Sequence, residues 1–302
     1  MEHILQENAM LVSLSINCAG FTRKDRDVTE KVNAEHAASH NAGKYDKHLL
    51  DPRMVEGPQR AARAARGDHE RLTLPWDGTF RLLPVDLFEK YTETMEDHKR
   101  RFNSAVSDLS GKLPQLIEQR RRQLNGMFRE SDYAQYANLE DRYVFKWSAR
   151  DVPMGANFYA KIVDDKAAAI RAQIDEDNND LLRSATRHSF ERLHKAVSHI
   201  ATCLKGYESV EVRKAGGKKK TEATRRLYDT MITNLCDLVD ILPALNVSGD
   251  ADLAALVEDI KRSELLNHSV EEFKDLSNAA VVQVVQSEAA EISDRLAGFF
   301  GG

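Results

Sequence analysis

The sequence predicts an α+β fold that is predominantly α, with a small β-sheet flanked by helices and a long antiparallel helical hairpin. Three observations predict it. Several long segments carry apolar residues at helical spacing. A few short segments are rich in aromatic and β-branched residues, as strands are. The 302 residues include 30% charged and 42% apolar side chains but only 7 Pro and 15 Gly, a composition that favours helix over loop.

The helical hairpin is expected between residues 190 and 245. Apolar residues spaced by three or four positions form a seam, the pattern that buries one helix against another. A Gly-Gly-Lys-Lys-Lys turn separates two such seams, so we expect two antiparallel helices with a cationic tip. The first seam is Phe190, Leu193, Val197, Ile200, Leu204 and Tyr207, and the second is Leu227, Met231, Leu238, Ile241 and Leu245, with polar Asn234 at the remaining position.

Three segments predict strands of one small sheet. Residues 11–18 alternate between apolar and polar side chains, which is typical of a half-buried strand. Residues 143–147 and 158–163 are aromatic and β-branched. We expect the latter two to join the first in the same sheet.

Helices account for most of the remaining chain before residue 165. Thr29 is expected to cap a helix that continues to His40, and residues 49–66 predict a helix interrupted at Pro52 and at Gly57-Pro58. The Pro and Asp-Gly content of residues 73–84 predicts a rigid loop.

A long helix is then expected from residue 85 to residue 129. Phe88, Tyr91, Met95, Phe102, Ala105 and Leu109 form its seam, His98 fills the missing step, and Gly111 and Pro114 bend or break it.

Helices also dominate the second half of the chain. The polar run 175–180 is expected to interrupt the first of them, and a last helix is expected over residues 270–300, followed by a frayed glycine-rich tail. We predict two domains, residues 1–165 with the sheet and the long helix, and residues 166–302 with the hairpin and the C-terminal helices.

Bulk properties favour a cytoplasmic protein. The net charge is −5, and no window approaches the unbroken apolar stretch that a membrane span needs. The residues before the short apolar segment near the start are acidic, unlike those of a signal peptide. Cys18, Cys203 and Cys236 are few and widely spaced, as reduced thiols are.

The sequence predicts no catalytic, cofactor-binding or metal-binding residues. His36 and His40 are spaced to share a helix face, but the intervening glutamate of a zincin is missing, so two surface histidines are the better interpretation. The acidic run 175–180 lacks the spacing and glycine of an EF-hand. Phosphate-binding loops, serine elbows and paired Cys-x-x-Cys motifs are absent from the sequence.

Basic clusters are the candidate contact sites for a nucleic acid or a protein partner. Phosphates bind such stripes, and an exposed Trp can stack on a base, although acidic neighbours and ordinary solvation of helix surfaces favour a weaker role. We interpret Trp76 first as an anchor for its loop. The candidate residues are Arg60, Arg63, Arg66, Arg71, Trp76, Lys218, Lys219, Lys220, Arg225 and Arg226.

Residues 10–165 resemble a family of phage and integrative-element proteins of unknown function. The motifs that carry the resemblance are Gly43-Lys44-Tyr45-Asp46-Lys47 before Leu49-Leu50, Leu74-Pro75-Trp76-Asp77-Gly78 with Arg81-Leu82-Leu83-Pro84, and Asp132-Tyr133. The resemblance implies a mobile-element setting and an assembly with a MoxR-type AAA ATPase, because such proteins are often encoded beside that ATPase and a von Willebrand A-domain protein. It implies no catalytic residues.

The sequence therefore predicts a non-enzymatic phage or mobile-element adaptor or scaffold. It is expected to bind protein partners, such as a AAA ATPase assembly, and to self-associate through its helical seams. The alternative is a nucleic-acid-binding protein that uses the basic helical stripe and the lysine-rich tip. A hydrolase with an unfamiliar site is a third, weaker alternative.

Overall fold

The structure is a computed structural model that describes residues 5, 7–153, 165–205, 209–213, 219–223, 228–269, 272–273 and 279–300. It confirms the α+β, predominantly α fold class, with 68% of the residues helical. The chain divides into two compact units. Unit 1 comprises residues 1–11, 72–88 and 150–302, and unit 2 comprises residues 12–71 and 89–149. This division differs from the predicted one at residue 165, because each unit is assembled from segments that are distant in sequence.

The main sheet has the strand order β4-β5-β1-β6. Strands β1 (Ala9–Asn17) and β6 (Val144–Arg150) confirm two of the expected strands, whereas the third, at 158–163, lies outside the described residues. Residues 73–84 were expected to form a loop. They instead contain the antiparallel strands β4 (Leu74–Pro75) and β5 (Arg81–Pro84). The turn between them includes Gly78, whose φ of 55° suits glycine.

Unit 2 begins with short elements. Antiparallel strands β2 (Thr22–Lys24) and β3 (Asp46–His48) enclose helix α2 (Arg26–Glu35). The N-cap of α2 is Asp25, whose carboxylate accepts a hydrogen bond from the Val28 amide, rather than Thr29 as predicted.

Two longer helices follow in unit 2. The turn η1 (Pro52–Val55) leads into α3 (Glu56–Leu72), in which Pro58 belongs to the first turn and causes no interruption. Turn η2 (Val85–Leu87) leads into α4 (Phe88–Leu124).

Helix α4 continues through Gly111 and Pro114, where a bend or break was expected. Pro114 is exposed, so water can satisfy the carbonyl that loses its partner in the helix. The predicted seam is buried at most positions, but Val106 replaces Ala105 and Phe88 is exposed. The buried seam residues of α4 are Tyr91, Met95, His98, Phe102, Val106 and Leu109.

The core of unit 2 lies between α3, α4 and the short turns that follow α4. These turns are η3 (Asn125–Met127), η4 (Glu130–Asp132), η5 (Ala134–Tyr136) and η6 (Glu140–Arg142). Tyr133 donates its hydroxyl proton to the Leu49 carbonyl oxygen at 2.7 Å, and burial raises the pKa of Tyr133 to about 12. The core also contains Phe21, Leu50, Ala62, Ala65, Phe102, Val106, Leu109, Tyr136 and Phe145.

Unit 1 contains the long helix α6 (Asp165–Leu204), which continues through the polar run 175–180 where an interruption was expected. Its polar residues there are exposed or half-buried, so the helix can continue without burying them. After α6 come the antiparallel strands β7 (Ser209–Arg213) and β8 (Lys219–Ala223), and then helix α7 (Asp229–Leu245). The two seam helices are therefore joined through a β-ribbon and not by a simple turn.

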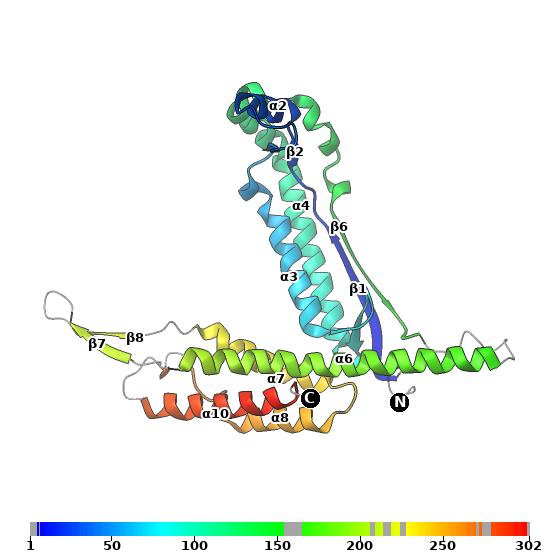
Figure 1. The fold of residues 1–302 in the computed structure, drawn as a ribbon, viewed down its shortest axis with the longest axis vertical. Helices are drawn as coiled ribbons and strands as arrows, with labels where there is room; N and C mark the ends of the chain where they lie inside the picture. Colours follow the sequence, from blue (N-terminus) through cyan, green and yellow to red (C-terminus); the bar gives the residue numbers. More distant parts are fainter. Residues whose placement is uncertain are drawn as a thin grey trace. The chain divides into compact units, whose positions relative to one another are not determined.

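Helices α7, α8 (Ala251–Arg262) and α10 (Ala279–Gly298) complete unit 1. Helix α6 contacts α7 and α10, and α7 contacts α8 (Figure 1). The seam of α6 is buried from Phe190 to Leu204.

On α7 the expected polar seam residue, Asn234, is exposed, and its neighbour Leu235 is buried instead. Tyr207 and Leu227, the seam ends nearest the ribbon, lie outside the residues whose burial is described.

The described last helix starts at Ala279, and residues 281–285 are helical as predicted despite their strand propensity. In the part of the chain that the structure describes, no helix combines the length and apolarity that crossing a membrane requires.

A buried lysine organises one end of unit 2. Only 3% of the Lys47 surface is exposed, and its Nζ lies 3.2 Å from Asp25 Oδ2 and 2.8 Å from Asp132 Oδ2. The same Nζ donates to the Met127 carbonyl oxygen at 2.9 Å. Its contacts therefore connect the start of α2, strand β3 and the turns after α4. A buried cation that is paired in this way holds carboxylates that would otherwise repel each other.

Replacing Lys47 with methionine should destabilise unit 2 by about 3 to 5 kcal/mol, because the buried carboxylates of Asp25 and Asp132 lose the cation between them. Asp132 keeps a second ion-pair partner, Arg23 at 3.3 Å. Urea unfolding, followed by Trp147 fluorescence in a Trp76→Phe background, reports on unit 2. The control is Lys44→Met, an exposed lysine in the same segment, which should change stability little. Equal stability of the two variants would contradict the structural role of Lys47.

Candidate functional site

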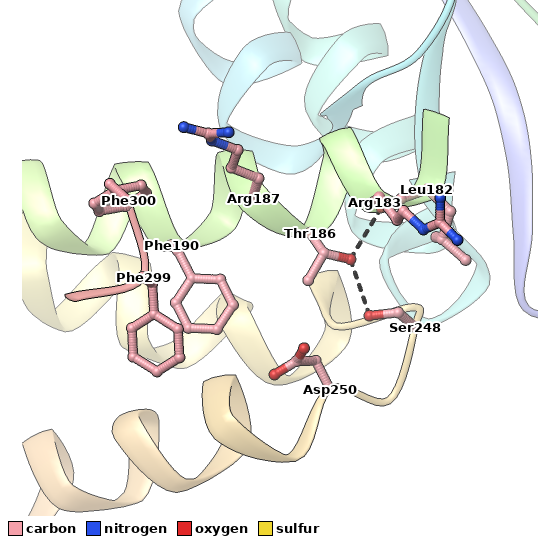
Figure 2. A pocket seen from close by; sticks show the side chains of 9 residues that line it. All are labelled: Leu182, Arg183, Thr186, Arg187, Phe190, Ser248, Asp250, Phe299 and Phe300. Carbon is pink, nitrogen blue, oxygen red and sulfur yellow. Dashed lines mark hydrogen bonds between the residues drawn. The ribbon is translucent and has the colours of Figure 1, made fainter. Parts of the chain in front are cut away.

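A pocket of about 350 Å³ lies on one side of α6 in unit 1 (Figure 2). It is formed by α6, the turn between α7 and α8, and the residues that follow α10. Its volume lies at the lower end of the range for small ligand sites. The residues that line it are Leu182, Arg183, Thr186, Arg187, Phe190, Ser248, Asp250, Phe299 and Phe300.

Aromatic rings form one wall of the pocket. The rings of Phe190 and Phe299 stack with centroids 4.6 Å apart and an interplanar angle of 23°. The centroid of the Phe300 ring lies 5.4 Å from that of the His194 ring. The segment after α10, which was expected to fray, therefore packs on α6, because stacking removes apolar ring surface from water.

Hydroxyl groups and a helix cap form the opposite side. Thr186 Oγ1 lies 3.0 Å from Ser248 Oγ, as Figure 2 shows. Asn246 Oδ1 accepts a hydrogen bond from the Asp250 amide at 2.8 Å, and Asp250 Oδ1 accepts one from the Leu253 amide at 2.9 Å. These bonds shape the turn at residues 248–250 and cap α8.

The two arginines at the pocket edge take part in surface ion pairs. Arg183 Nη1 lies 2.9 Å from Asp180 Oδ1, and Arg187 Nε lies 3.4 Å from Glu191 Oε1. The Arg187 guanidinium also lies 6.0 Å from the centre of the Phe300 ring. Exposed pairs of this kind contribute little to stability, so both side chains can reorient when a partner approaches.

The pocket combines an apolar surface with hydroxyl groups. Ser248 Oγ contacts Thr186 and, at 3.4 Å, Asn246, and neither of these is a base that could activate a hydroxyl. Four of the nine lining residues are apolar or aromatic and can take up an apolar side chain, while the hydroxyls can bond to a peptide backbone.

Unit 2 contains a polar network between α3 and α4. His98 Nε2 lies 2.7 Å from Asp68 Oδ2, and Arg71 Nε donates to Asp68 Oδ1 at 3.0 Å. Burial alone raises the pKa of Asp68, but the hydrogen bonds from His98 and Arg71 outweigh it and lower that pKa.

A second pair lies beside it, since His69 Nδ1 and the Tyr91 hydroxyl oxygen are 2.8 Å apart. Each of these groups bonds to a neighbouring helix. We therefore assign the network to holding α3 against α4.

Four arginines among the predicted contact residues lie on α3. Arg60 is exposed on α3, and Arg63 lies 3.7 Å from Glu56. Arg66 donates to the Ile16 carbonyl oxygen at 2.9 Å, and Arg71 binds Asp68. Trp76 is half-buried in unit 1, whereas the four arginines belong to unit 2.

The lysine-rich segment is described only in part. Lys219 and Lys220 belong to strand β8, while Lys218, Arg225 and Arg226 lie outside the described residues. The histidine pair does not share a helix, because α2 ends at Glu35 with His36 as its C-cap. Within the described residues, no cluster of three or more His, Cys, Asp or Glu side chains could hold a metal ion.

The pocket residues could not be predicted from local sequence patterns, because they come from segments that are distant along the chain. A weak signal was present in the two adjacent phenylalanines, Phe299 and Phe300, directly after a helix. Exposed aromatic residues in such a position often have a packing partner.

Comparisons with protein-family models, curated proteins and solved structures found no match to this chain. The resemblance of residues 10–165 to a mobile-element family therefore stays a prediction. Function is inferred below from the residues of the chain itself.

Asp68→Asn should lower the unfolding free energy of unit 2 by about 1 kcal/mol at neutral pH, because a charge-assisted bond to His98 is lost at a partly exposed site. The folded-state pKa of Asp68 is lowered, so its stabilising contribution is complete above the unfolded pKa of about 4. It is lost as pH falls through the folded pKa. The stability difference between wild type and variant should therefore be constant above about pH 5 and shrink at lower pH.

The measurement is urea unfolding between neutral and acidic pH with the Trp147 reporter. Asp108→Asn, on the exposed surface of α4, is the matched control and should show no such difference. A stability difference that grows as pH falls would rule out the assigned role of Asp68.

Proposed function

We propose that the protein is a non-enzymatic adaptor that binds a protein partner at the pocket on α6. The observation that carries the proposal is the exposed ring of Phe299, stacked on the buried ring of Phe190, beside hydroxyl groups that can bond to a backbone. Such a site takes an apolar side chain of a partner as its anchor and fixes the surrounding chain by hydrogen bonds.

The seams of the helices favour this placement of the partner. Leu193 and Val197 on α6 and Leu235 on α7 are completely buried or nearly so within the chain. A seam that is already covered offers little surface to a second molecule. The pocket, in contrast, keeps Phe299 44% exposed.

The polar networks of unit 2 support a structural role for their charged groups. Lys47 binds two carboxylates and Asp68 binds His98. Each group stabilises the fold through these bonds. A general acid or base would instead need to face a site where a substrate can bind.

A AAA ATPase assembly of the MoxR type is the partner that we propose, and the resemblance of residues 10–165 supports it. Adaptors for such assemblies need docking surfaces and no chemistry of their own. In the proposed setting, a phage or mobile element in a bacterial cytoplasm, the chain would join the ATPase to another component.

The test is co-expression with a MoxR-type ATPase, followed by gel filtration and light scattering. We expect a complex of fixed stoichiometry. Phe299→Ala should weaken the complex at least about tenfold, because truncating an aromatic anchor removes its buried surface.

Val284→Ala is the matched control, since Val284 is 45% exposed and lies in α10 away from the pocket. It should leave the complex intact. Separate elution of the wild-type proteins would reject the ATPase as partner, and equal binding by both variants would reject the pocket.

A further inference from the structure

The register of the ribbon β7–β8 pairs two basic residues, Arg213 and Lys219, and places Lys220 next to them opposite Val212. Like charges directly opposite on neighbouring strands are unfavourable. An anion bound beside this pair would relieve the repulsion.

The sequence around the ribbon concentrates positive charge far beyond the average of the chain. Between residues 209 and 226 there are seven basic residues and two acidic ones, whereas the whole chain has a net charge of −5. This segment is therefore a strong local attractor for a polyanion in a chain that is acidic as a whole. Counterions released from phosphates drive such local binding.

We propose that the β7–β8 ribbon is a nucleic-acid-binding arm that contacts the phosphate backbone through Arg213, Lys219 and Lys220. A two-stranded ribbon has dimensions that the DNA major groove admits. The ribbon lies beyond the C-terminal end of α6, and Figure 1 shows it extending away from the helices of unit 1. It is also separate in sequence from the pocket residues, so this inference stands independently of the adaptor function.

The composition of the ribbon favours a nucleic acid over a membrane or an acidic protein. Val210, Val212 and Ala223 are the apolar residues of its two strands, and neither strand contains an aromatic residue. Insertion into a lipid interface needs a larger apolar face. An acidic protein segment rarely offers charges as regularly spaced as those of a phosphate backbone, which an extended basic ribbon can follow.

The experiment measures binding of a fluorescent DNA duplex of about 20 base pairs, and of its single strand, by anisotropy at about 50 and about 200 mM salt. We expect the wild-type affinity to fall at least about tenfold between the two salt concentrations, as counterion release requires. The triple variant Arg213→Ala, Lys219→Ala, Lys220→Ala should bind at least about tenfold more weakly at low salt and show a shallower salt dependence.

The matched control removes the same charge from other surfaces of unit 1, through Lys195→Ala, Lys261→Ala and Arg262→Ala. It should retain the wild-type affinity. Circular dichroism of both triple variants must match the wild type, and a single variant, Lys219→Ala, serves where the triple variant does not fold. Equal loss of affinity in the control, no binding by the wild type, or tighter binding to polyglutamate or to vesicles with anionic lipid would overturn the proposal.

Discussion

A long amphipathic helix must bury one apolar stripe along its length, and this constraint shapes the rest of unit 1. Helix α6 has 40 residues, and an isolated helix with its seam in water would expose Leu193, Val197 and Ile200. Each such side chain stabilises the fold by about 1.5 to 3 kcal/mol when it is buried. Helices α7 and α10 supply the cover, and α8 in turn covers α7. Packing, more than intrinsic helix propensity, therefore holds these helices.

The same constraint determines where the molecule can bind something else. The apolar seams are buried by packing between helices of the same chain. Sites for a second molecule are therefore expected where this packing ends. One is the pocket, where the turn at 248–250 and Phe299 meet α6 without filling the space between them. Another is the β7–β8 ribbon, whose strands contain basic residues in place of an apolar seam. Burial along α6 thus separates an apolar site from a cationic one within a single unit.

Periodicity predicted the helices and the fold class, because the three-four spacing of buried residues is a local property of the sequence. Periodicity gave wrong predictions where a helix packs on two sides, and where strands are very short. Asn234 was placed in the seam, yet α7 is covered by both α6 and α8, and the buried face widens to include Leu235. The strand β8, Lys-Lys-Thr-Glu-Ala, has weak strand propensity, and the sequence alone favoured a simple turn there. The pocket was unpredictable from local patterns, because Phe190, Ser248 and Phe299 come from three distant segments.

Salt offers a physical way to separate the two proposed sites. Contacts between a cationic ribbon and phosphates weaken as the ionic strength rises, because the release of counterions becomes less favourable. Burial of an apolar side chain against Phe190 and Phe299 does not depend on charge, and salts excluded from protein surfaces strengthen it. The edge arginines of the pocket are already paired with Asp180 and Glu191, so they add little salt dependence of their own. A partner held at the pocket should therefore stay bound at a salt concentration that releases a nucleic acid from the ribbon, and the two functions can act in one molecule without competing.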